Sequence, residues 1–233
     1  MPEIQRLYEL QGVDLELDWR NARLSEITKA LGDESSLVPL RDEVHIAEAA
    51  VKVITAKQHD LDQIIGGFDV RIAEGDAKLY GGTIKLAREL QDLQADIAMI
   101  KRQRGEQEDM LLLVLEEGDA ARDRYNTGST ALATAEEAWS VHQASMTEER
   151  GKLQMEVVSL ISERATQATT VTAGDLALYE QVRKARKGKA IAILHGSTCD
   201  SCKVGIPNKL VQEARSEGKI VRCSNCGLIL LPE

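Results

Sequence analysis

A repeating spacing of apolar residues constrains this chain more than any other feature. Between residues 37 and 72, eleven positions alternate steps of three and four residues without a slip, and nearly all of them are apolar. This spacing places one apolar stripe along one face of a helix and is typical of the seam of a coiled coil. The same rule holds over 10–31 and over 86–114, and a weaker stripe continues over 135–160. Most of the first 160 residues are therefore expected to be coiled-coil helix.

Two adjacent glycines interrupt the pattern in the stretch LYGGT, residues 79–83. Glycine adopts backbone conformations that other residues avoid, so this stretch favours a chain reversal. Two architectures compete, because a parallel dimer would run one helix through this point and an antiparallel hairpin would turn at it. Helix-breaking stretches near 31–39 and 125–129 lie at equal distances from the glycines and would face each other in a hairpin. The matched breaks favour the hairpin, with its tip near 79–83.

The matched breaks themselves have two interpretations. A change of coiled-coil phase on one strand needs compensation on the other, or the two breaks together form a hinge. The oligomeric state is open as well, because Val53, Val70 and Leu112 lie outside the seam and could pair two hairpins.

Aromatic residues make up only 3% of the chain, while 29% of its residues are charged. The large rings that dominate most globular cores are therefore scarce, and helix packing through Leu, Ile, Val and Ala is the economical solution. We expect a mostly α-helical protein, with a long antiparallel coiled-coil hairpin over 1–171 and a small α+β domain over 172–233.

The segment after residue 171 changes character. Thr172 and Asp175 form a pattern similar to a capping box, which predicts a short helix from Ala173 to about Lys187. Strands are predicted over 189–194, 219–223 and 228–232, and a second short helix over 207–216. Together these elements make a zinc ribbon.

All four cysteines lie in this segment as two C-x2-C pairs, with 20 residues between Cys199–Cys202 and Cys223–Cys226. Each such turn points two sulfurs at one place, and two turns complete the tetrahedral thiolate shell that Zn²⁺ prefers. Two disulfides are the alternative, but thiols stay reduced in the cytosol and residues 1–10 lack a secretory signal pattern. We expect one structural zinc ion and a cytoplasmic protein.

A shell of four cysteines leaves no open position for the water that a catalytic zinc requires. His195 is the one nearby side chain that could exchange into the shell, and a surface position is its simpler interpretation. The stretch GDESS, residues 32–36, lacks the lysine and spacing of a phosphate-binding loop. No stretch approaches the ~18 consecutive apolar residues of a membrane span. We therefore expect neither an enzyme with a small-molecule substrate nor a membrane protein.

Charge is divided unevenly along the chain. Residues 1–171 carry 19 Lys and Arg against 32 Asp and Glu, whereas residues 172–233 carry 10 against 6. The acidic hairpin suits protein partners, and Leu79 and Tyr80 at its tip either close the seam or contact such a partner.

Five positive charges gather within seven residues, at Arg183, Lys184, Arg186, Lys187 and Lys189. Cations in the last turn of a helix complement its dipole, and the same side chains could contact phosphate groups. Residues 199–233 contain no aromatic side chain on which bases could stack. Any nucleic-acid binding should therefore be weak, directed at the backbone and strongly salt-dependent.

The chain as a whole resembles the bacterial family of coiled-coil hairpin proteins that end in a C4-type zinc ribbon. The resemblance is carried by LYGGTIKLARELQDLQADI at the tip, LALYEQVRKARKGKA before the ribbon, and CDSCKVGIP with IVRCSNCGLIL inside it. It implies zinc ligation by the four cysteines. It also implies a regulatory adaptor, since members are tied to an alternative sigma factor, to flagellar or secretion machinery, or to RNA.

We therefore expect a non-enzymatic, zinc-binding adaptor or regulatory protein that engages protein partners through its hairpin and ribbon, with a link to transcription implied by the resemblance. One alternative is a regulator that binds RNA or DNA through residues 183–189 and the ribbon. A second is a purely architectural spacer. The sequence does not identify the partner.

Overall fold

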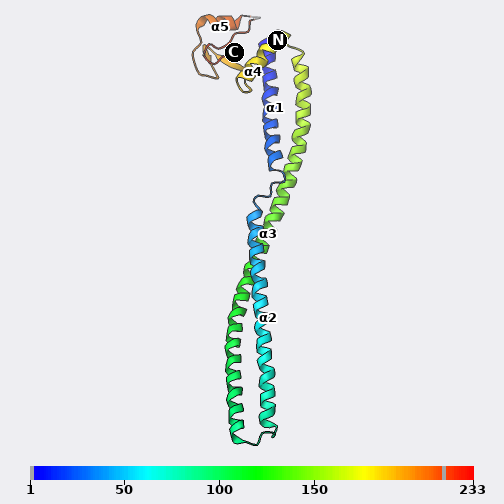
Figure 1. Ribbon diagram of the computed structural model, residues 1–233. Coiled ribbons are helices and arrows are strands. Elements are labelled where there is room, and N and C mark those ends of the chain that lie inside the picture. The colour runs from blue at the N-terminus through cyan, green and yellow to red at the C-terminus, as the bar shows by residue number, and fades with distance from the viewer. Residues whose placement is uncertain (1–2, 217–218) are drawn as a thin grey trace. The chain divides into compact units, whose positions relative to one another are not determined.

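The computed structural model describes residues 3–216 and 219–233, which form five helices and three short strands (Figure 1). The helices are α1 (Glu3–Ala30), α2 (Val38–Tyr80), α3 (Ala87–Ala168), α4 (Ala173–Ala185) and α5 (Asn208–Arg215). The strands are β1 (Ile191–His195), β2 (Thr198–Cys199) and β3 (Ile229–Pro232). None of the helices in these described ranges is long and apolar enough to cross a membrane. The mostly helical class with a small C-terminal strand region is confirmed.

The chain divides into two compact units. One unit consists of residues 33–141, and the other combines residues up to 32 with those from 142 onward. This grouping differs from the boundary predicted between residues 171 and 172, because the start of the chain belongs to the same unit as its end. We call the first unit the hairpin unit and the second the ribbon unit.

In the hairpin unit, α2 and the first part of α3 lie side by side and run in opposite directions (Figure 1). Arg41 near the start of α2 pairs with Glu136 at 3.0 Å, whereas Asp69 near its end pairs with Arg104 at 2.9 Å. Partners on α3 thus descend as positions on α2 ascend, which confirms the antiparallel hairpin.

The turn lies where the two glycines predict it. Helix α2 ends at Tyr80 and α3 begins at Ala87. A methyl group on Gly81 would lie 2.6 Å from the carbonyl oxygen of Ala77, and Gly82 has a φ of +69°. Neither position accommodates a side chain without strain, so both glycines are required for the reversal.

The register of the hairpin differs from the one that the sequence suggested. A methyl group on Gly75 would meet Ile97 at 2.8 Å, and one on Gly118 would meet Ile54 at 3.4 Å. A reversal centred on the two glycines would instead set Gly75 opposite residue 89, so the expected pairing was wrong by eight residues. Two features account for the difference. The connection between the helices extends over 81–86, so it is longer than the two glycines alone. In addition, the side chains of each helix point toward the N-terminus of that helix, so a residue of α2 meets a later residue of α3 than the one directly opposite its backbone.

The helix break predicted over 125–129 is absent, and the prediction of matched breaks was wrong. Helix α3 continues through this stretch, where the Thr130 hydroxyl donates to the Asn126 carbonyl oxygen at 2.8 Å. A methyl group on Gly128 would only reach ordinary contact with Val44, at 3.5 Å. One glycine inside a helix costs about 1 kcal/mol, and helix packing on either side outweighs that cost.

The break predicted over 31–39 is confirmed, because α1 ends at Ala30 and α2 begins at Val38. Gly32 has a φ of +80°. The Gln143 side chain of α3 accepts a hydrogen bond from the Gly32 amide at 2.9 Å and donates one to the Ala30 carbonyl at 3.3 Å. Helix α3, which continues past this point, therefore supplies hydrogen-bond partners to backbone groups at the end of α1 that have none within their own helix.

The sheet of the ribbon unit has the order β2-β1-β3. Strand β1 pairs antiparallel with β2 and parallel with β3. The strand predicted over 219–223 does not form, and only an isolated bridge joins Arg222 to Ile229. The second cysteine turn begins at Cys223, directly after this bridge, and ends the pairing there. The predicted helix cap is present, since the Thr172 hydroxyl accepts from the Asp175 amide at 3.3 Å.

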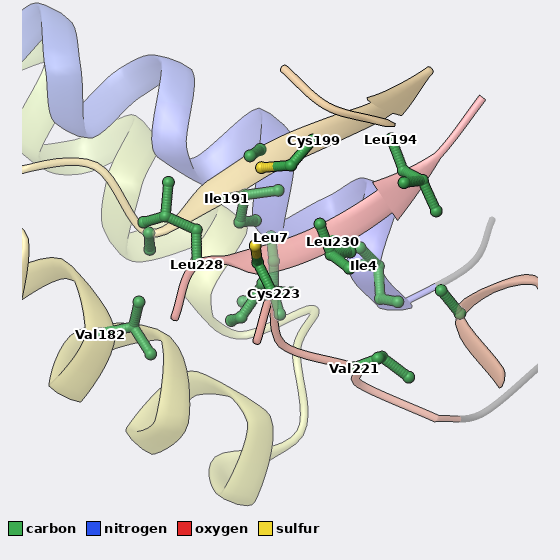
Figure 2. Close-up of a cluster of buried hydrophobic side chains, with 14 of the residues drawn as sticks. Ile4, Leu7, Val182, Ile191, Leu194, Cys199, Val221, Cys223, Leu228 and Leu230 are labelled. Carbon is green, nitrogen blue, oxygen red and sulfur yellow. The ribbon is translucent and has the colours of Figure 1, made fainter. Parts of the chain in front are cut away.

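Among the described residues of the ribbon unit, the larger of two hydrophobic clusters surrounds the cysteine turns (Figure 2), and a smaller one of Ile27, Met146 and Leu153 lies between α1 and α3. Helix α1 contributes Ile4, Leu7 and Leu10 to the larger cluster, where they pack against residues of α4, of the three strands and of the cysteine turns. Cys199 and Cys223 are themselves buried in this cluster. The first turns of α1 are therefore part of the ribbon core.

Candidate metal centre

The two cysteine turns share one backbone design. In the first, the Cys199 amide donates to the Val204 carbonyl oxygen at 3.1 Å and the Lys203 amide donates to the Cys199 carbonyl oxygen at 2.8 Å. The second repeats both bonds at the same spacing, from Cys223 to Leu228 at 2.7 Å and from Gly227 to Cys223 at 2.8 Å. The fifth residue of each turn has a positive φ, 58° at Lys203 and 71° at Gly227. Each turn therefore curls its backbone around a pair of thiols.

The four sulfur atoms converge on one point. All four Sγ atoms lie within 4.8 Å of one another, and Cys199–Cys226 and Cys202–Cys223 are each separated by 3.8 Å. A tetrahedral ion with Zn–S bonds of about 2.3 Å holds its sulfurs about 3.8 Å apart. The donor set and its spacing therefore fit a metal ion bound by all four predicted ligands.

The environments of the thiols differ. Burial raises the pKa of Cys199, and burial raises that of Cys226 to about 12. Hydrogen bonds from the Asn225 side chain and the Val204 backbone lower the pKa of Cys202 to about 6. Without a cation, four thiolates so close together would repel one another. A divalent ion removes this penalty and binds the ionised forms.

His195 stands apart from the sulfurs. Its Nδ1 lies 2.8 Å from a carboxylate oxygen of Glu233, and the ring is largely exposed. Among the described residues, the four cysteines form the single group of His, Cys, Asp and Glu side chains close enough to share an ion. Four sulfur ligands complete a tetrahedral shell, so the arrangement suits a structural ion.

Gln11 of α1 holds the first strand beside this centre. Its side chain is buried, with 3% of the residue exposed. The side-chain oxygen accepts from the backbone amides of Ala190 at 2.7 Å and Ile191 at 2.6 Å, and the side-chain nitrogen donates to the Ile191 carbonyl oxygen at 3.2 Å. One side chain thus satisfies three buried backbone groups where β1 begins.

Asp14, one turn further along α1, is 1% exposed and is the most buried charged residue among those that the structure describes. It accepts hydrogen bonds from Arg164 of α3 at 2.6 Å and from the Tyr179 hydroxyl of α4 at 2.8 Å. Burial, together with this contact to Asp14, raises the pKa of Tyr179, and the same carboxylate raises the pKa of Arg164. Asp14 therefore joins three helices beneath the ribbon.

The five basic residues predicted as a contact surface have different environments. Arg183 is half-buried and pairs with Asp18 at 2.7 Å and with Asp14 at 3.5 Å. Lys189 is half-buried, whereas Lys184, Arg186 and Lys187 are exposed. The structure thus leaves three of the five on the surface.

The tip residues differ from each other as well. Leu79 is half-buried, and Tyr80 is 82% exposed. Leu86, at the other end of the same turn, is 62% exposed. The sequence predicted Tyr80 as a contact residue of the tip, but it placed Leu86 in the coiled-coil seam, so the exposure of Leu86 was not predicted.

Gln11 and Asp14 were also missed. Both lie on the apolar side of α1 and follow Leu7 and Leu10 at helical spacing, so a polar residue on a buried stripe was the available signal. Their partners lie about 150 to 180 residues away in the chain, beyond the reach of any local pattern.

The fold and the site define a class of helical hairpin proteins that also carry a small C-terminal strand region in which four clustered cysteines could hold a metal ion. Residues 10–187 match the family described as "CT398-like coiled coil hairpin domain". The chain belongs to this family.

Several proteins are similar to this chain over nearly its whole length. The "Uncharacterized protein Rv2229c" of Mycobacterium tuberculosis is 26% identical over 97% of this chain and 93% of its own. The solved structure of CT398 from Chlamydia trachomatis has a TM-score of 0.71 at 16% identity and covers 99% of this chain and 98% of its own. A structure from Mycobacterium smegmatis has a TM-score of 0.63 at 20% identity, with 99% and 100% covered. At these identities the solved structures support the fold alone.

Proposed function

We propose that this chain is a non-enzymatic adaptor of the cytoplasm, in which one structural zinc ion shapes the ribbon and the hairpin presents a surface to protein partners. The observation that carries the proposal is the closed arrangement of the four sulfurs, within 4.8 Å of one another. Four thiolate ligands fill the tetrahedral shell and leave no position for substrate or water. Zinc is the ion that this donor set favours.

The hairpin tip supports a role in binding proteins. Tyr80 and Leu86 border the same turn and expose large apolar side chains. Amphipathic aromatic side chains such as tyrosine are enriched at protein interfaces. A transcription-linked partner is what the family resemblance implies, and it is part of this proposal.

Metal content tests the first half of the proposal. The purified chain should carry one zinc ion, measured by elemental analysis against protein concentration, and Cys202→Ser should lower the content to near zero. A preparation with no bound zinc after metal addition, or with unchanged content in Cys202→Ser, would contradict it.

A photo-reactive amino acid in place of Tyr80 tests the second half in cells. We expect protein adducts from position 80 that are lost when Leu86→Ala is added. Val70, exposed on α2 away from the turn, provides the matched control position. Identical adducts from positions 70 and 80 would show non-specific capture, and no adduct from position 80 would remove the tip from the binding surface.

Nucleic-acid binding is the second candidate, and the exposure of Lys184, Arg186 and Lys187 favours it. A labelled single-stranded RNA should bind weakly, with affinity that falls steeply between low and high salt. Lys184→Gln with Lys187→Gln should weaken this binding. An RNA affinity that did not change with salt concentration would contradict binding of these side chains to the phosphate groups.

A further inference from the structure

Two arginines meet at the second cysteine turn. A methyl group built on Gly227 would lie 3.3 Å from Nη2 of Arg186 and 3.3 Å from Nη2 of Arg222. Arg186 follows the last residue of α4, and Arg222 directly precedes Cys223. Residues far apart in the sequence thus bring two guanidinium groups to one point on the backbone next to Cys226.

Both side chains approach the turn itself. Nε of Arg222 donates to the Gly227 carbonyl oxygen at 2.9 Å, and the Gly227 amide closes the turn on the Cys223 carbonyl oxygen at 2.8 Å. The left-handed φ of Gly227, 71°, and the absence of a side chain there let both guanidinium groups come close.

Within the part of the chain that the structure describes, these two positive charges have no carboxylate partner. Over residues 3–216 and 219–233, neither Arg186 nor Arg222 forms an ion pair, although Arg183, three residues before Arg186, pairs with Asp18. Two like charges at one point repel each other unless a negative group lies nearby. Four thiolates around one Zn²⁺ leave two excess negative charges. Cys226 adjoins Gly227, which both arginines approach, and Cys223 directly follows Arg222.

We propose that Arg186 and Arg222 form a cationic clamp on the second cysteine turn, which balances the charge of the metal–thiolate centre and slows loss of the ion. This inference rests on the proposed zinc site. Arg186 acts here as a positioning residue that links α4 to the centre without contacting the ion. Groups that hold metal ligands from outside the coordination shell commonly change affinity 10- to 100-fold when removed.

The test uses the full-length zinc-loaded chain and a chromogenic chelator, with the rate of zinc release and the zinc affinity as readouts. Arg186→Gln should release zinc about tenfold faster, and the double variant with Arg222→Gln faster still. Lys184→Gln removes the same charge from an exposed position on α4 and should match the unmodified chain. Arg186→Lys keeps the charge and should restore most of the slow release.

Salt gives an independent readout, because an electrostatic clamp is screened by ions. The difference between the unmodified chain and Arg186→Gln should shrink as salt rises. Equal release rates for Arg186→Gln and Lys184→Gln would overturn the clamp while leaving the zinc site intact. A chain that binds no zinc would overturn both the clamp and the proposed function.

Discussion

The hairpin unit and the ribbon unit are stabilised in different ways. Along the hairpin, few side chains are fully buried, and apolar residues such as Ile46, Val53 and Leu112 remain more than half exposed. In the ribbon unit, nineteen residues from α1, α4, α5, the strands and the cysteine turns form one buried cluster. Two paired helices can bury only one stripe each, whereas a module wrapped by several elements buries side chains from many directions. Stability is therefore spread along the hairpin and concentrated in the ribbon unit.

This difference predicts how each unit responds to damage. The loss of one side-chain contact between α2 and α3 leaves the many similar contacts along the hairpin in place. Loss of one of the four cysteines would remove a ligand of the proposed metal ion, which would join both cysteine turns beside the small sheet. A module of this size needs such a metal centre in addition to its apolar core, because a small domain buries only part of the surface that its unfolded chain exposes.

The largest expected effect is therefore loss of the metal. Cys202→Ser, or a strong chelator, should unfold the ribbon, because structural zinc contributes on the order of 10 kcal/mol in small finger peptides. Hydrogen exchange should show lost protection over residues 190–233 and over the first turns of α1, whose Leu7 and Leu10 pack in the same cluster.

The hairpin provides the control for this experiment. Residues 38–80 and 87–141 should keep their exchange protection and most of the helical circular dichroism signal. Loss of protection along the hairpin would show that the two units are not stabilised separately.

The second largest effect is expected at Asp14. Asp14→Asn leaves Arg164 without its buried carboxylate, and removing one partner of a buried ion pair costs about 3 kcal/mol. Urea unfolding of the ribbon unit, followed by exchange at β1, measures this loss. Asp18→Asn is the matched control, since Asp18 is half-exposed and its pair with Arg183 should contribute less than about 1 kcal/mol. Equal losses of unfolding free energy from both variants would mean that the buried contacts of Asp14 with Arg164 and Tyr179 do not stabilise the ribbon unit more than an exposed ion pair does.

The same contrast explains what the sequence could predict. Heptad spacing and the C-x2-C pairs are local patterns, so the helices, the tip at Gly81 and Gly82, and the sulfur cluster followed from them. The register did not, because it depends on how residues 81–86 cross between helices. Gln11 and Asp14 were not predicted as site residues, since their role depends on partners at the other end of the chain. The break expected near Gly128 was a wrong inference from propensity, which packing overrides.

Helix packing in the hairpin gives the third prediction. Gly75→Ala would place a methyl group 2.8 Å from Ile97 and should destabilise the hairpin by about 1–3 kcal/mol. Gly105→Ala is the control within α3, because the added methyl group would meet no atom within 4 Å beyond the neighbouring residues and backbone of its own helix. It should stabilise the hairpin by up to about 1 kcal/mol, since alanine is the better helix former. Thermal unfolding should show a lower unfolding temperature for Gly75→Ala and an equal or higher one for Gly105→Ala. A higher unfolding temperature for Gly75→Ala would show that the two helices move apart easily where Gly75 faces Ile97.

The smallest effect on stability is expected at the tip. Tyr80→Ala removes a ring that is 82% exposed, and surface substitutions usually change stability by less than about 0.5 kcal/mol. The unfolding temperature should therefore match that of the unmodified chain, whereas Leu79→Ala, at the half-buried neighbour, should lower it. A large loss from Tyr80→Ala would assign the ring to the seam and remove the reason to regard it as a binding residue. An unchanged unfolding temperature combined with lost capture at the tip would separate binding from stability within two adjacent residues.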